Sequence, residues 1–169
     1  KSFDPGDPLA PFQVAREGGD PVKGREIFLT HAVGQCSKCH KIDGDGGIAG
    51  PELTGVGSKH DSLYFLESLV SPSAIVAPGY GITLVSLKNG ESLGGILMSE
   101  TEGEIVLKMP DPTDAAKQIE RRIPMQDVAN RQPPVSAMPP MGYLLKKSEV
   151  RDLVAFLGSL KAGSAKKGH

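Results

Sequence analysis

Residues 36–40 read Cys-Ser-Lys-Cys-His, and this short stretch decides how the rest of the chain is interpreted. Residues three and four positions apart are neighbours on a helical turn, so Cys36, Cys39 and His40 are expected to lie on one face of such a turn. The chain has only 2 cysteines, and both belong to this stretch. A disulfide framework needs more cysteines at wider spacings, so these two cysteines must have a local role.

The spacing Cys-x-x-Cys-His is the signature of covalent haem attachment. Cys36 and Cys39 would each form a thioether with one vinyl group of the porphyrin, and His40 would bind the iron as its first axial ligand. A zinc site that adds His31 or His60 stays open, although structural zinc sites usually pair their ligands over two separated spacings. A thioredoxin-like redox pair also stays open, although no strand is expected before Cys36. The motif can also occur by chance.

Three further features follow along the chain. They are the run Gly50-Pro51-Glu52-Leu53-Thr54-Gly55, the run Met138-Pro139-Pro140, and an apolar helical segment that contains Phe156. In content and order, these features together with residues 36–40 resemble class I cytochromes c. The resemblance implies that the carbonyl group of Pro51 orients the His40 ring, and that Met138 is the sixth ligand of the iron. It also implies that Gly24 and Phe28 pack against Phe156.

A closer resemblance covers nearly everything from Gly24 to Lys161. Its segments are similar to the C-terminal haem-binding domain of planctomycete and verrucomicrobial proteins of the Pirellula and Verrucomicrobium type; they are residues 50–58, 66–74, 78–80, 136–142 and 152–157. In those proteins the domain commonly follows a large dehydrogenase-like or propeller domain. The resemblance therefore implies an upstream dehydrogenase domain or a separate redox partner protein as the electron donor.

Helical signals are found within residues 20–77 and again within residues 131–161. Asp20 is expected to cap a helix that begins at Pro21, and Asp61 to cap a second one. The last helix is expected from Ser148, because the apolar residues after it fall on one helical face. Residues 41–59 are rich in glycine and are expected to form an irregular loop.

Between Gly79 and Pro124 the pattern changes to the period of β-strands, with Asn89-Gly90 as a hairpin turn. Four strands are expected, and a fifth is possible within the same module; the four are residues 82–87, 92–98, 104–109 and 118–123. The module resembles a small Sm-like or SH3-like barrel, but it lacks the basic and aromatic pattern of an RNA site.

The predicted fold class is therefore α+β, with a small antiparallel β-barrel inserted between the third helix and the methionine loop of a helical cytochrome c core. Four regions are expected: a linker or arm at 1–19, a cytochrome c domain at 20–77 and 131–161, the inserted module at 78–130, and a disordered tail at 162–169. The start at Lys1 shows neither a signal peptide nor an initiator methionine, so an excised or processed piece of a longer protein is expected.

Composition excludes several classes of function. With 19 basic and 20 acidic residues the formal charge is −1, so no broad basic surface is available for nucleic acid. No stretch has the apolar length of a membrane span. We expect an electron-transfer domain with one haem c, and not an enzyme in itself, in the periplasm or at the cell surface. The alternative function is a haem-based sensor or gas-binding module with an open sixth position; a peroxidase is disfavoured because no distal acid–base pair is found.

Overall fold

The structure is a computed structural model, and it describes residues 6–77 and 79–163. The chain divides into two units, one formed by the residues up to Ile75 together with those from Met138 onward, and the other by Val76–Ala137. Each unit is described by itself below. The predicted tail lies outside the described residues from position 164 onward, and so do the first five residues of the predicted linker or arm.

Three helices carry the core of the first unit: α1 (Pro21–Thr30), α3 (Ser62–Val70) and α4 (Lys147–Ser159). Two of them begin where the sequence predicts. The side chain of Asp20 accepts hydrogen bonds from the backbone of α1, and Asp61 Oδ1 accepts one from the Tyr64 N–H at 3.0 Å. An N-cap of this kind satisfies backbone donors that the first helical turn leaves unpaired.

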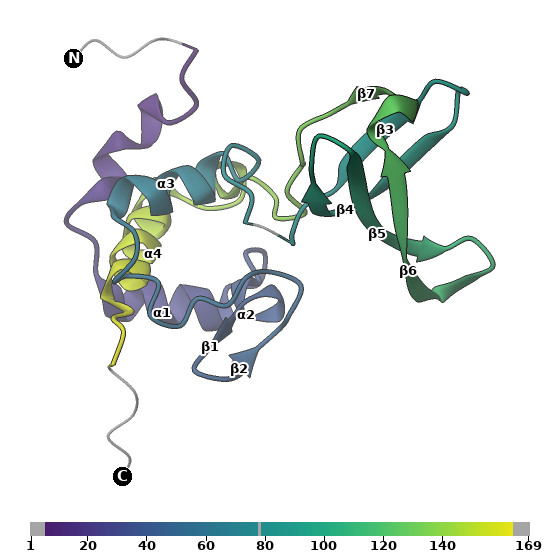
Figure 1. Cartoon of the computed structure of the whole chain (residues 1–169). Coiled ribbons are helices and arrows are strands. Elements are labelled where there is room, and N and C mark those ends of the chain that lie inside the picture. Colours follow the sequence, from purple (N-terminus) through teal and green to yellow (C-terminus); the bar gives the residue numbers. More distant parts are fainter. Residues whose placement is uncertain (1–5, 78, 164–169) are drawn as a thin grey trace. The chain divides into compact units, whose positions relative to one another are not determined.

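Helix α4 contacts both α1 and α3 (Figure 1). The α1–α4 crossing is close because Gly24 has no side chain: an added β-carbon would overlap the Asp152 carbonyl group and lie 2.7 Å from Cβ of Phe156. The rings of Phe28 and Phe156 pack beside this crossing with their centroids 5.6 Å apart. The contact that the cytochrome c resemblance implies between these residues is thus confirmed.

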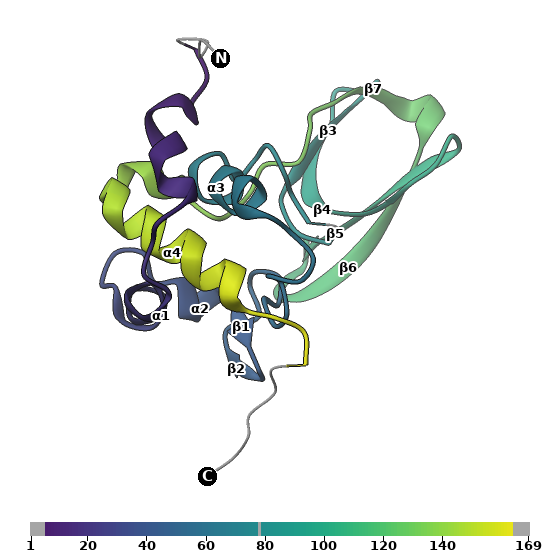
Figure 2. The ribbon, with the colours of Figure 1, turned by 90° about the vertical axis from the view of Figure 1, so that its left-hand side faces the viewer.

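The segment before α1 is a 3-10 helix, η1 (Ala10–Arg16), which packs against α3 and α4. Ala15 is buried, and Leu9 and Phe12 are packed at the margin of the same hydrophobic cluster. The purple segment in Figure 2 shows η1 beside α3 and α4. Residues 9–16 therefore contribute to the core of this unit.

The second unit is an antiparallel sheet with the strand order β6-β5-β4-β3-β7. Its hairpin at Asn89-Gly90 joins β3 to β4 as predicted, and it closes with the Leu87 N–H donating to the Glu91 carbonyl at 2.8 Å. The strands are β3 (Thr83–Leu87), β4 (Ser92–Glu100), β5 (Glu104–Asp111), β6 (Asp114–Pro124) and β7 (Val128–Arg131).

The predicted closed barrel is not supported, although the mixture of helices and a sheet is confirmed. The sheet curls, as Figure 2 shows, but among the described residues β6 and β7 do not pair with each other and remain the two edges. Strand β7 has 4 residues and pairs with β3, while β6 has 11 residues whose side chains are mostly exposed. A barrel needs that last pairing to remove its edges.

The inward side chains of the sheet form a hydrophobic cluster of their own: Val85, Leu87, Leu93, Ile105, Leu107 and Ile123. The module extends further than the sequence indicates at its C-terminal end. Residues 128–131 form a strand, and Val135 pairs with Ile82 in an isolated bridge, although residues from 131 onward were expected to belong to the cytochrome c domain. These late residues add to the module by pairing with its first strand.

Candidate haem-attachment site

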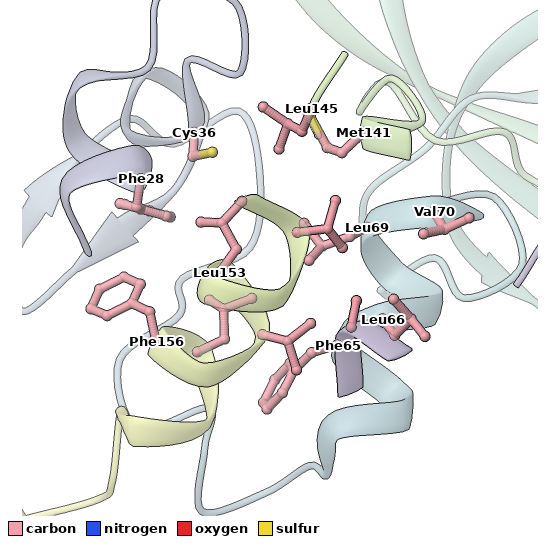
Figure 3. Packing of buried hydrophobic residues seen from close by; sticks show 14 residues of the cluster. Phe28, Cys36, Phe65, Leu66, Leu69, Val70, Met141, Leu145, Leu153 and Phe156 are labelled. Carbon is pink, nitrogen blue, oxygen red and sulfur yellow. The ribbon is translucent and has the colours of Figure 1, made fainter. Parts of the chain in front are cut away.

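The Cys-x-x-Cys-His stretch forms the expected single helical turn, α2 (Cys36–Cys39). The His40 N–H closes the turn by donating to the Cys36 carbonyl group at 2.9 Å. Both cysteines are free thiols; Cys36 is buried and Cys39 is exposed. Burial raises the pKa of the Cys36 thiol above the ordinary value for cysteine. Figure 3 shows the Cys36 sulfur pointing toward the side on which Leu145 and Met141 lie.

The loop before this turn is tied down by His31. Its Nδ1 atom accepts hydrogen bonds from the N–H groups of Gly34 at 2.9 Å and of Val33 at 3.3 Å. An acceptor nitrogen carries no proton, so the hydrogen of the neutral ring is on Nε2, which lies 3.6 Å from Glu149 Oε1. His31 therefore connects the end of α1 to the start of α4, and it does not turn toward the cysteines.

The loop after the turn folds back onto it through backbone hydrogen bonds. The Gly47 N–H donates to the Ser37 carbonyl at 3.0 Å, and the Gly50 N–H donates to the Cys39 carbonyl at 2.8 Å. Gly47 makes this approach possible, because an added β-carbon there would overlap the Lys38 carbonyl group. The part of this loop that was expected to be irregular contains a short hairpin of strands β1 (Lys41–Ile42) and β2 (Asp45–Gly46).

The His40 ring is held in a defined orientation by residues 50 and 51. Its Nδ1 atom lies 2.8 Å from the Pro51 carbonyl oxygen. Since a carbonyl oxygen only accepts, Nδ1 donates its hydrogen, and the lone pair of the neutral ring is on Nε2. Gly50 lies close to the same ring: an added β-carbon would be 2.6 Å from Cε1 and 2.9 Å from Nδ1. A histidine whose Nδ1 donates to a carbonyl oxygen has its Nε2 lone pair available to bind a metal.

The methionine segment, residues 138–142, belongs to the same unit, and its last two residues begin η3 (Met141–Tyr143). Met138 is half-buried and packs against the margin of the hydrophobic cluster, whereas Met141 is only 3% exposed. Figure 3 shows Met141 beside Leu145, within the cluster. The two thioethers are thus in different surroundings, and Met141 already fills a packing position.

The structure argues against the zinc alternative. In the part of the chain that the structure describes, no three His, Cys, Asp or Glu side chains are grouped so that they could hold a metal ion. His31 faces Glu149, and the His60 ring stacks on Tyr64 with the ring centroids 3.6 Å apart. Neither histidine joins Cys36 and Cys39.

The residues present fit a covalently attached haem. Two free thiols stand three residues apart on one turn, and the histidine that follows has its Nδ1 hydrogen bonded to a backbone carbonyl. Cys36, Cys39 and His40 would hold the group, and haem c when bound supplies one-electron chemistry at its iron. The chain's own contribution is to hold the His40 ring in one orientation and one tautomer.

Comparison with known families agrees with this geometry. Residues 21–79 match the cytochrome c family model, a range that contains α1, the 36–40 turn, the loop over it and α3. No curated protein matches the chain. The match supports a haem-based electron-transfer domain of the cytochrome c class, which is not catalytic by itself and typically works with redox partners. Met138 lies beyond the matched range, so its role stays a prediction.

One further property of the fold concerns membranes. Among the described residues, every helix is too short or too polar to cross a lipid bilayer.

Sequence reasoning missed the place of Gly50 against the His40 ring and the packing of η1. Gly50 is part of the Gly-Pro pair that was noted, but nothing in the sequence alone shows what its missing side chain makes room for.

Proposed function

We propose that the chain carries single electrons through one haem c, with Cys36 and Cys39 as the thioether attachments and His40 and Met138 as the axial ligands of the iron. The observation that carries this proposal is the His40 ring, whose Nδ1 atom is 2.8 Å from the Pro51 carbonyl and whose orientation is confined by Gly50. The only pair of cysteines allows one haem of this type. A thioether ligand and burial of the ring would set the reduction potential.

Burial supports Met138 over Met141 as the sixth ligand. Met141 is 3% exposed and packs inside the cluster, so its removal from that position would leave a cavity. Met138 lies at the margin of the cluster and precedes Pro139-Pro140, whose rings fix the backbone dihedrals beside it. This Met-Pro order is the one that the cytochrome c resemblance implies for the ligand.

The electron donor that we propose is a dehydrogenase, either attached upstream or a separate protein, and the acceptor is a further redox protein. The resemblance to the C-terminal haem-binding domains of planctomycete and verrucomicrobial proteins supports this arrangement. Bacterial haem attachment takes place outside the cytoplasmic membrane, so we place the protein in the periplasm or at the cell surface. Any sequence upstream of Lys1 would test the proposed donor, because a dehydrogenase domain there would identify it.

The experiment that tests the proposal is denaturation of the purified protein in acid and organic solvent. The haem is expected to stay with the chain, and a thiol assay on the unfolded protein is expected to find no free cysteine. Extractable haem with two titratable thiols would refute covalent attachment. Addition of carbon monoxide to the reduced folded protein tests the sensor alternative: rapid binding would indicate an open sixth position in place of a methionine ligand.

A further inference from the structure

The 3-10 helix η1 lies outside the range that matches cytochrome c, yet it is built into the core of this unit. Ala15 is 1% exposed, and Leu9 and Phe12 pack against the same cluster that Met138 and Met141 contact. The stretch between η1 and α1 also contacts α4, because the Asp20 N–H donates a hydrogen bond to Asp152 Oδ1 at 2.9 Å. The segment is therefore fixed at both ends.

Phe12 contacts the methionine segment directly. A β-carbon added to Gly142 would lie 2.8 Å from Cζ and 3.1 Å from Cε2 of Phe12, so the outer edge of the ring rests on the backbone of Gly142. Lys147 Nζ lies 5.8 Å from the centroid of the same ring, within the range of a cation–π attraction. The Phe12 ring thus lies against the middle residue of η3 and faces Lys147 in the first turn of α4.

Gly142 is well placed to transmit this contact to the ligand loop. It follows Met141, whose carbonyl oxygen accepts hydrogen bonds from the N–H groups of Leu144 at 3.0 Å and Leu145 at 2.9 Å. Met138 is only four residues before Gly142. A loop opens locally when the contacts that hold it are few, so a contact at its base changes how often its ligand leaves the iron.

We propose that η1 clamps the methionine segment and that Phe12 is a positioning residue for the sixth ligand, acting through Gly142. The proposal deepens the proposed function and rests on it, because it requires Met138 to bind iron. Removal of the Phe12 ring leaves the ligand itself unchanged and makes its loop easier to open.

Titration of the oxidised full chain with imidazole measures this opening. Imidazole reaches ferric iron only when the methionine has left, so its apparent affinity is proportional to the fraction of molecules with an open loop. Phe12→Ala is expected to strengthen imidazole binding about tenfold, equal to about 1.4 kcal/mol. Gly142→Ala perturbs the same contact from the other side and is expected to act in the same direction. In the Phe12→Ala background it should add less than about twofold, because coupled residues are not additive.

Two control variants separate positioning from general loss of stability. Val14 belongs to η1 but is 74% exposed, so Val14→Ala should leave the imidazole affinity unchanged. Leu160 packs against the same cluster just beyond the last residue of α4, about 20 Å along the helix axis from Lys147. Leu160→Ala should lower the overall stability without a matching change in imidazole affinity.

The outcomes distinguish the two proposals. A tenfold gain in imidazole affinity for Phe12→Ala, with the affinity of both control variants unchanged, supports the clamp. No gain in affinity, or an equal gain for Leu160→Ala, overturns it. If Phe12→Ala does not fold, Gly142→Ala decides in the same way. If the unaltered ferric protein lacks the sulfur-to-iron absorption band in the far red, methionine ligation itself fails. If that band is present and Phe12→Ala changes nothing, only the clamp fails.

Discussion

Substitution of Gly50 by alanine should disturb the His40 ring without replacing any of the residues proposed to bond to haem. The new methyl carbon would lie 2.6 Å from Cε1 and 2.9 Å from Nδ1 of the ring, closer than real β-carbons come to other heavy atoms. Either the ring or the loop must move. The contact most exposed to such a shift is the 2.8 Å hydrogen bond from Nδ1 to the Pro51 carbonyl, because Gly50 immediately precedes Pro51.

The size of the effect follows from two quantities. Added volume in a packed site costs about 1–3 kcal/mol of stability, and a lost hydrogen bond about 0.5–1.5 kcal/mol; the two overlap here and are not summed. A hydrogen bond donated by Nδ1 makes the imidazole a stronger electron donor to the iron, and this favours ferric over ferrous iron. Its loss should raise the reduction potential. A difference of about 1 kcal/mol between the two oxidation states corresponds to about 40 mV for one electron.

Redox titration and urea unfolding of matched variants measure both effects. The control is Gly158→Ala, because an added β-carbon there has no other heavy atom within 4 Å and the residue lies inside α4. Gly158→Ala should stabilise the protein by about 0.5–1 kcal/mol, since glycine weakens a helix, and should not change the potential. If Gly50→Ala shifts the potential by less than about 10 mV, a quarter of the expected value, the hydrogen bond to Pro51 does not tune His40.

Three further predictions concern the ligand, the thiol and the inserted module. Met138→Ala should abolish the sulfur-to-iron absorption band and lower the potential, whereas Met141→Ala should keep the band but cost about 2–5 kcal/mol of stability as a buried methionine; the reverse result would shift the ligand by three residues. Because burial raises the pKa of the Cys36 thiol, the unfolded chain loses this proton at lower pH than the folded one, so the haem-free protein should lose stability as pH rises above about 8.5. Urea unfolding measured at several pH values in that range should show that the free energy of unfolding falls less steeply with pH in Cys36→Ala than in the unaltered protein. Replacement of Val76–Ala137 by a glycine-serine linker should leave a low-spin haem spectrum, and a high-spin spectrum in a folded variant would show that the module positions the sixth ligand.

The helices and the turn at 36–40 were predictable because their signals are local. Asp20 and Asp61 each lie directly before a helix and cap it through backbone groups two or three residues away. The turn at 36–40 needs only the spacing of three side chains on one helical turn. Such signals depend on a few neighbouring residues, so the sequence displays them completely.

Other elements were missed for two different reasons. Asp43-Gly44 is a hairpin signal inside a loop rich in glycine, where the many glycines hide it; both residues have positive φ, at 50° and 89°, as a two-residue turn between paired strands requires. Strand β7 gives almost no local signal, because only Val128 among its residues is partly buried. It exists because it pairs with β3, which precedes it by more than 40 residues. The open sheet follows from the same non-local pairing, which alternation along one strand does not reveal.

The candidate site depends on both kinds of information. Its side chains stand in one motif, but the orientation of His40 comes from a backbone carbonyl and from a position without a side chain, and neither has a chemical signature of its own. The resemblance to cytochromes c supplied Pro51, while the role of Gly50 emerged only from the folded chain. A sequence that keeps Cys-x-x-Cys-His but places a larger residue at position 50 would therefore keep the motif and lose the hydrogen bond that orients its histidine. Motif and loop must be read together, because the motif provides the proposed ligand, His40, and the loop decides how the ring of His40 points.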